Sequence, residues 1–370
     1  MPPRTRSTRS GSATRSRARR PRPVGGRVLV IGGYGAVGVT VTRVLAAGLP
    51  DRVVVAGRDP VRARRTGTGL GAHAGVALDI TDLDAVERAV REHEVSTVVL
   101  CVEPADGALA RRLFGLGVHL VDVGPTYELL AQVERAAPVA TEAGATGLIS
   151  VGLAPGLTNL LARRAVTELG GADRVDITLL IGAAEEHGPD VVRWTVDQLA
   201  ASSRAPEPAP PLAVELPGYG RRTAHPFPFS DQYSLRRTLG VPAVVTRMAL
   251  DPAYLGTSVF AMRRLGVYKL TRWPWVRRAM IASLGGVAVG GDGFVVRVDA
   301  HRAGRRVSYA LTGREQSRCT ALVAAHATRH LLSGALEPGV RHVDEIPALD
   351  GVPELLAPEG YALWTPDRLG

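Results

Sequence analysis

The sequence is short of lysine, cysteine and long apolar runs, and each shortage argues against a class of function. Lys269 is the only lysine among 45 basic residues, so any lysine-dependent mechanism must use Lys269. The two cysteines, Cys101 and Cys319, lie far apart and outside any Cys/His cluster, which argues against a disulfide framework and a structural metal site. No apolar run reaches the roughly 18 residues that a membrane-spanning helix needs. We therefore expect a cytoplasmic protein without a bound metal.

Positive charge is concentrated at the start of the chain. The formal net charge of +10 would by itself suggest a nucleic-acid or membrane partner. Eight arginines, however, precede the first hydrophobic run: Arg4, Arg6, Arg9, Arg15, Arg17, Arg19, Arg20 and Arg22. Without them the chain is close to neutral, and the Ser, Thr and Pro residues around them cannot form a core. We predict a disordered basic tail over residues 1–26 and no specific nucleic-acid partner.

Short apolar runs alternate with stretches of helical period over residues 27–152, which is typical of a parallel sheet covered by helices. Residues 28–31, 53–55 and 98–100 are unbroken Val, Ile and Leu, as buried parallel strands require. The predicted strands span residues 27–32, 52–57, 75–78, 96–101, 118–123 and 146–150. The pattern predicts an α/β fold with a doubly wound parallel sheet, that is, a Rossmann domain over residues 27–152.

The pattern changes after residue 150. It predicts a strand over residues 174–182, a helix over 189–201, a proline-rich connection over 202–230, and an antiparallel hairpin of residues 293–300 and 305–311. A helix follows over residues 315–332. We therefore expect a second, α+β substrate and dimerisation domain with antiparallel strands over residues 153–312.

A glycine-rich loop joins the first predicted strand to the first predicted helix. It consists of Gly32, Gly33, Tyr34, Gly35, Ala36, Val37 and Gly38. In this context glycines let the backbone approach a pyrophosphate, whose charge is stabilised at the N-terminus of the helix. We predict that these seven residues bind a dinucleotide.

The second strand ends in Gly57 and Arg58 instead of an acidic residue. An acidic residue would accept a hydrogen bond from the ribose 2′-OH of NAD, whereas a guanidinium matches the 2′-phosphate of NADP. Arg62 can add a second cation, and Asp59 can serve the ribose if the loop is shifted by one residue. The sequence thus favours NADP(H) over NAD(H).

Three further residues are predicted to contact the cofactor. Asp79, after the third strand, contacts the adenine edge or caps the next helix. Cys101 and Val102 come at the carboxyl end of the fourth strand, where the nicotinamide binds in this fold.

Four segments together resemble the saccharopine dehydrogenase family, in its reductase-type branch. They are the glycine-rich loop, Val-Leu-Cys-Val at 99–102, Gly-Val-His-Leu-Val-Asp at 117–122, and Gly-Leu-Ala-Pro-Gly at 152–156. The resemblance implies an NADP-binding Rossmann domain and an α/β substrate domain, with C-terminal helices and a tail over residues 313–370 that return to the first domain. It also implies hydride transfer at a carbon–nitrogen bond between two amino-acid-like units, and it places Trp194 at the substrate pocket. The family has an acidic residue where this chain has Ala154.

Candidate proton donors are sparse in the second half. The cluster Glu185-Glu186-His187 follows a predicted strand, and we predict His187 as a general acid and Glu186 as a substrate contact. A solvated turn before a helix explains the same residues equally well. His225 and Asp231 are alternative donors. The Tyr-x-x-x-Lys pair of short-chain reductases is excluded, because Leu265 precedes Lys269 by four positions.

A basic, aromatic segment spans residues 268–278 and leads into apolar residues 279–284. Such a segment can contact a membrane surface or receive an acyl substrate, or it can form a lid or a homodimer contact. The sequence therefore leaves both a peripheral membrane contact and a homodimer open.

These features predict an NADP(H)-dependent oxidoreductase of saccharopine dehydrogenase type, acting on a C=N or C=O bond of a small-molecule or acyl substrate. One alternative is a trans-acting enoyl or keto reductase of a lipid or polyketide pathway. Another is a non-catalytic NADP(H)-binding regulator, because a fold does not determine a function.

Overall fold

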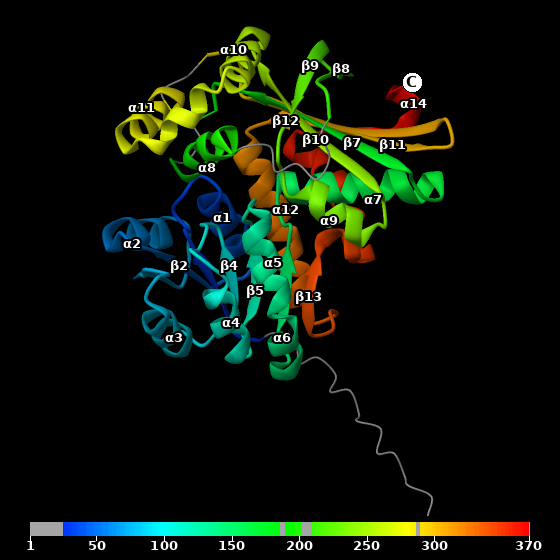
Figure 1. The fold of residues 1–370 in the computed structure, drawn as a ribbon. Coiled ribbons are helices and arrows are strands. Elements are labelled where there is room, and N and C mark those ends of the chain that lie inside the picture. The colour runs from blue at the N-terminus through cyan, green and yellow to red at the C-terminus, as the bar shows by residue number, and fades with distance from the viewer. Residues whose placement is uncertain (1–24, 186–188, 202–208, 286–288, 370) are drawn as a thin grey trace, which may run out of the picture.

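Two seven-stranded sheets organise the chain, one above the other in Figure 1. The computed structural model describes residues 25–185, 189–201, 209–285 and 289–369. Most of the predicted basic tail lies outside these residues. The α/β class predicted from the sequence is confirmed.

The first sheet is parallel throughout, in the order β13-β6-β5-β4-β1-β2-β3. Its strands are β1 (Arg27–Ile31), β2 (Val53–Gly57), β3 (Ala74–Ala77), β4 (Val95–Leu100), β5 (His119–Asp122), β6 (Thr146–Ile149) and β13 (Gly339–His342). The strand order reverses between β1 and β4, which is the point where a doubly wound sheet binds its ligand. The six predicted strands lie within a residue or two of those observed. The seventh, β13, was not predicted.

Helices cover both faces of this sheet. One face packs on α1 (Gly38–Gly48) and on α12 (Gln316–Leu332), which comes from far along the chain. The other face packs on α3 (Leu83–Glu92), α4 (Ala108–Gly115), α5 (Tyr127–Arg135) and α6 (Ala137–Ala143). Helix α2 (Pro60–Gly69) lies beside β2 and β3. Helix α3 begins after Asp82, which caps it by accepting from Ala85 N at 2.9 Å, and its apolar side is buried.

The second sheet is mixed, in the order β14-β12-β11-β7-β10-β9-β8. Its strands are β7 (Arg174–Gly182), β8 (Leu212–Leu216), β9 (Gly220–Pro226), β10 (Ala243–Asp251), β11 (Gly293–Arg302), β12 (Arg305–Arg314) and β14 (Ala362–Trp364). Strand β7 pairs in parallel with β10, and the other pairs are antiparallel. Strands β11 and β12 form the predicted hairpin, but Ala303 and Gly304 alone make its turn, both with positive φ.

The proline-rich connection predicted over residues 202–230 is wrong in part, because it contains the hairpin of β8 and β9. Among the described prolines, Pro210 and Pro211 lie before β8, Pro217 lies in the turn, and Pro226 is the last residue of β9. The hairpin also lies against buried charges of the sheet. Arg297 pairs with Asp299 at 2.8 Å and donates to Glu215 O at 2.9 Å, so its guanidinium is satisfied although buried.

The remaining helices lie between and around the sheets. They are η1 (Leu153–Leu157), α7 (Thr158–Leu169), α8 (Pro189–Ala200), α9 (Asp231–Thr238), α10 (Ala253–Arg264), η2 (Val267–Arg272), α11 (Pro274–Gly285), η3 (Val343–Glu345), η4 (Pro347–Leu349), α13 (Val352–Leu355), η5 (Ala357–Glu359) and α14 (Pro366–Leu369). Helices α8, α10 and α11 gather at one end of the second sheet (Figure 1). No helix in the described ranges is long and apolar enough to cross a membrane.

Candidate active site

The loop of residues 32–38, which we call the phosphate loop, connects β1 to α1 and fits a pyrophosphate. Gly32 has φ +77°, and a Cβ on Gly38 would lie 2.1 Å from Gly32 O, so the loop closes only with glycine at these positions. The backbone N–H groups of Ala36, Val37 and Gly38 donate to no acceptor among the described residues. Free N–H groups at the start of a helix bind anions.

Tyr34 of the phosphate loop reaches across to the end of β2. Its hydroxyl accepts from Asp59 N at 2.9 Å, and the Arg62 guanidinium lies over its ring at 4.6 Å. Gly57 makes room for the ring, since a Cβ there would lie 2.4 Å from the Tyr34 Cε1. The ring thus lies at the end of the second strand, where this fold binds the adenosine ribose.

Arg58 is an exposed cation at this position, and the neighbouring Asp59 is engaged as a helix cap. The Asp59 carboxylate accepts from Val61 N at 2.9 Å and from Arg62 N at 3.0 Å, which caps α2. Both hydrogen bonds reach Asp59 Oδ1, so they hold the side chain at the start of α2. The arrangement therefore favours the 2′-phosphate beside Arg58.

Asp79 accepts from the backbone N–H of Thr81 at 2.9 Å and from its hydroxyl at 2.8 Å. These hydrogen bonds and, to a smaller extent, the nearby Arg58 lower the pKa of Asp79. The cap of α3 is Asp82 instead, so the helix-cap alternative for Asp79 is wrong. Its contact with the adenine edge stays a prediction.

The carboxyl edge of β4 and β5 brings together Cys101, Val102, Glu103 and Asp122. Burial raises the pKa of the Cys101 thiol to about 12, so this sulfur stays protonated. Burial also raises the pKa of Asp122 to about 6, although the N–H of Gly124, which donates to its Oδ1 at 2.8 Å, opposes the rise. The sequence did not single out Asp122, although an Asp at the end of a parallel strand is a usable signal.

A cavity of about 290 Å³ extends from this edge into the space below the second sheet. Its cofactor end is lined by residues 101–103, 123–125 and 152–155 together with Val37, and its far end by apolar side chains of β7, β10, α8, α10 and α11. The far-end side chains include Leu179, Ile181, Leu199, Met248, Leu250, Leu255, Val259 and Leu284. Residues 152–155 thus line the same cavity as Cys101 and Val102, which are predicted to contact the nicotinamide.

Trp194, predicted at the substrate pocket, lines this cavity from α8. Its ring packs against Phe227 and Phe229, with centroid distances of 5.7 Å and 5.5 Å. The indole Nε1 is buried and has no hydrogen-bond partner among the described residues. An unpaired buried donor is costly, which favours an acceptor supplied by a ligand.

The predicted acid–base cluster falls largely outside the described residues. Glu186 and His187 are not described, so their roles stay predictions. Glu185 lines the cavity, but its carboxylate accepts from Gln316 N at 2.7 Å and from Ser317 N at 2.8 Å, so it caps α12.

The alternative donors do not line the cavity. His225 stacks on Phe260 at 4.3 Å, and Asp231 is buried and accepts from the Thr246 hydroxyl at 2.6 Å. Within the described ranges, no three His, Cys, Asp or Glu side chains come together as metal ligands.

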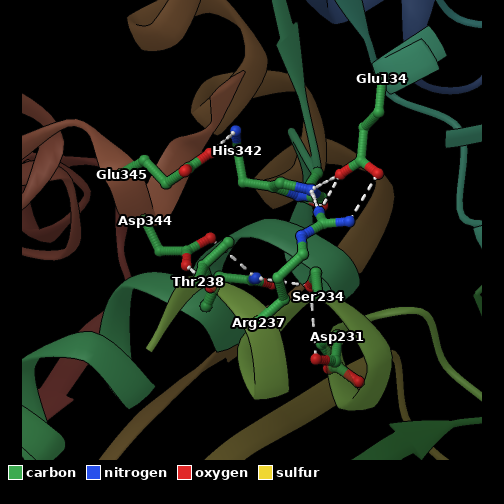
Figure 2. A network of polar contacts seen from close by, with 10 residues as sticks. Glu134, Asp231, Ser234, Arg237, Thr238, His342, Asp344 and Glu345 are labelled. Carbon is green, nitrogen blue, oxygen red and sulfur yellow. Dashed lines mark hydrogen bonds and ion pairs between the residues drawn. The ribbon is translucent and has the colours of Figure 1, made fainter. Parts of the chain in front are cut away.

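A second cluster, which we call the polar joint, connects the sheets away from the cavity and consists of Glu134, Ser150, Arg237 and His342. Figure 2 shows Glu134, Arg237 and His342 meeting between α5, α9 and β13. Ser150 Oγ lies 2.7 Å from His342 Nδ1, and Arg237 Nη1 donates to Glu134 Oε2 at 2.7 Å. Ser150 is fully buried, so the Ser–His–Glu set has no access to a substrate and serves to connect the sheets.

Burial by itself raises the pKa of Glu134, but hydrogen bonds from His342 and Arg237 outweigh it and lower the pKa to about 2. The carboxylate of the polar joint is therefore ionised at neutral pH and well into the acid range.

Comparison with known proteins supports this geometry. Residues 28–148, which contain the phosphate loop and the carboxyl edge, match the model of the saccharopine dehydrogenase NADP binding domain. A search of curated protein sequences gives no significant match.

Two solved structures share the fold of nearly the whole chain. One is an apo saccharopine dehydrogenase (L-Glu forming) from Saccharomyces cerevisiae, at 17% identity and a TM-score of 0.64, covering 92% of this chain and 100% of that one. The other is a homospermidine synthase from Legionella pneumophila in complex with NAD, at 12% identity and a TM-score of 0.62, covering 94% and 93%. The predicted resemblance and the predicted cofactor, NADP(H), are confirmed for the domain of residues 28–148. Residues 28–148 therefore form a saccharopine dehydrogenase NADP binding domain, and nearly the whole chain shares the fold of these two structures.

Proposed function

We propose that the protein transfers a hydride between NADP(H) and the C=O or C=N carbon of a substrate whose body is apolar. The observation that carries this proposal is the cavity, whose far end is built from Leu, Ile, Val and Met side chains. An apolar body buried there gains roughly 25 cal/mol per Å² removed from water.

The lining also argues against two amino-acid-like units as the substrate. Such units carry carboxylates, which proteins bind with arginine or lysine. The described lining residues include no Arg, Lys or His. A single polar group on an apolar chain fits this lining better, with its oxygen or nitrogen at the cofactor end.

Bound NADPH supplies the hydride that a carbonyl or imine carbon accepts. The former C=O oxygen or C=N nitrogen then needs a proton. Glu103 lines the cavity at this end and is our candidate for the group that delivers it, and Asp122 behind it is our candidate for the group that restores it. His187 is the alternative donor. We propose that the Trp194 indole N–H binds a polar atom of the substrate.

The test follows NADPH oxidation with a homologous series of linear ketones and the matching 2-keto acids, each with and without an amine. We expect kcat/KM for the ketones to rise about fourfold per added methylene, from about 0.8 kcal/mol each, until the cavity is full. Leu255→Trp, which narrows the far end, should shorten the preferred chain without changing NADPH affinity. Val61→Trp on the exposed side of α2 is the matched control.

Two results would contradict the proposal. A preference for keto acids condensed with amino acids would restore the polar substrate that the family resemblance implies. Tight NADPH binding without turnover of any carbonyl or imine would favour the non-catalytic regulator.

A further inference from the structure

Residues 253–285 form α10, η2 and α11, and we call them the helical cap. In Figure 1 the two helices lie at the edge of the molecule, in yellow. Within the described ranges, ten large apolar side chains are exposed, and six of them belong to the cap. These six, which we call the outer patch, are Tyr254, Met262, Leu265, Leu270, Trp273 and Trp275, between 38% and 80% exposed. Helix α11 has no buried residue at all.

The helical cap is also purely basic. No acidic residue occurs between Asp251 and Asp292. Two of its cations are engaged, because Arg277 pairs with Asp197 at 2.6 Å and the half-buried Arg263 donates to Pro226 O at 3.0 Å. The exposed ones are Arg264, Lys269, Arg272 and Arg278.

Tryptophan, leucine and basic side chains on one exposed surface are the composition of helices that lie at a membrane surface. The aromatic rings and apolar chains enter the headgroup region, and the cations meet anionic lipid. The Arg272 guanidinium lies over the Trp273 ring, 5.5 Å from its centroid, so an exposed cation and an exposed aromatic ring lie side by side.

The inner side of the same helices lines the cavity through Leu255, Val259 and Leu284. The cap therefore separates an apolar cavity from an apolar surface with a single layer of helix. Val191 of the neighbouring α8 belongs to both, since it lines the cavity and is 43% exposed.

We propose that the helical cap docks on the surface of an anionic lipid bilayer, with the outer patch at headgroup depth. A second copy of the chain is a poorer occupant. In a two-fold dimer the patch would face itself, and eight exposed cations would meet with no carboxylate from the cap between them. An anionic bilayer matches both the apolar and the charged part. If the proposed function holds, docking also places the cavity beside the region from which an apolar substrate enters.

The test is flotation of the full chain with vesicles, without substrate or cofactor. Vesicles contain either phosphatidylcholine alone or phosphatidylcholine mixed with phosphatidylglycerol. We expect binding to the mixed vesicles that weakens steeply as salt is added, and much weaker binding to the neutral ones. The double substitution Trp273→Ser and Trp275→Ser should reduce binding to the mixed vesicles at least tenfold. Val61→Ser with Leu355→Ser, two exposed apolar residues elsewhere, is the matched control and should bind like wild type.

The basic N-terminal segment needs its own control, because eight arginines there can also attract anionic lipid. A full-length variant with these eight changed to serine should keep most of the binding. The proposal is overturned if the tryptophan variant binds like wild type, or if the arginine variant alone loses binding. It is also overturned if wild type does not bind vesicles and instead forms a dimer, by sedimentation velocity, that the tryptophan variant cannot form. NADPH affinity must be unchanged in every variant, so a negative result here leaves the proposed hydride transfer untouched.

Discussion

The phosphate loop and the cavity lie at two ends of one site but are built in different ways. The phosphate loop comes from seven consecutive residues, and the groups it offers to a ligand are mainly backbone N–H groups. The cavity takes its lining from residue 37 to residue 320 and uses side chains of both sheets. Substitutions in the phosphate loop should therefore change only the affinity for the cofactor. Substitutions between the two sheets should change the substrate range, the stability and its dependence on pH.

The largest effect is expected for Gly38→Ala. The added Cβ would lie 2.1 Å from Gly32 O, so the phosphate loop has to open and its N–H groups lose their alignment. We expect NADPH affinity, measured by fluorescence titration, to fall at least a hundredfold, or about 2.7 kcal/mol. Gly69→Ala on α2, where a Cβ meets nothing within 4 Å, is the control and should bind normally. Normal NADPH binding by Gly38→Ala would mean that the pyrophosphate binds elsewhere.

A smaller and selective effect is expected for Arg58→Ala. The exposed guanidinium should contribute about 1.4 kcal/mol to binding the 2′-phosphate and nothing to binding NADH. NADPH affinity should thus fall about tenfold while NADH affinity stays the same. Arg65→Ala, another exposed arginine on α2, should change neither. Equal losses for the two cofactors would show that Arg58 does not select between them.

The smallest effect is expected in the polar joint, for Glu134→Gln. The folded-state pKa of Glu134 is lowered from 4.5 to about 2, so its stabilisation is complete above pH 4.5 and is lost as the pH falls towards 2. The glutamine variant should unfold about 1 kcal/mol more easily at neutral pH. In urea titrations at several pH values this difference should shrink through that acid window. A difference in unfolding free energy that is the same at all pH values would mean that the carboxylate charge does not stabilise the polar joint.

The difference between features built from consecutive residues and features built from distant segments also explains which parts of the fold the sequence could predict. Strands β1 to β6 were predicted because buried parallel strands are continuous apolar runs. Strand β13 was not predicted, because Gly-Val-Arg-His has no such run and its partner β6 lies about 190 residues earlier. The hairpin of β8 and β9 was not predicted, because its short alternation of apolar and polar residues is surrounded by prolines.

The candidate site shows the same limit. The phosphate loop and Arg58 were predicted from local sequence, and Trp194 from a resemblance. Asp122 was missed because its raised pKa comes from burial, which the packing of distant segments decides. The cap formed by Glu185 was missed for a related reason, since the N–H groups it accepts from belong to residues 316 and 317.

The two short strands near the C-terminus have a consequence for biosynthesis. Strand β13 completes the edge of the first sheet, β14 adds to the second, and α12 covers α1. A ribosome that has released only the first 150 residues has therefore exposed a dinucleotide domain with one apolar face still open. The first sheet can gain its last strand only after residue 342 has emerged, and the second only after residue 364, so a truncated product should be a target for proteolysis.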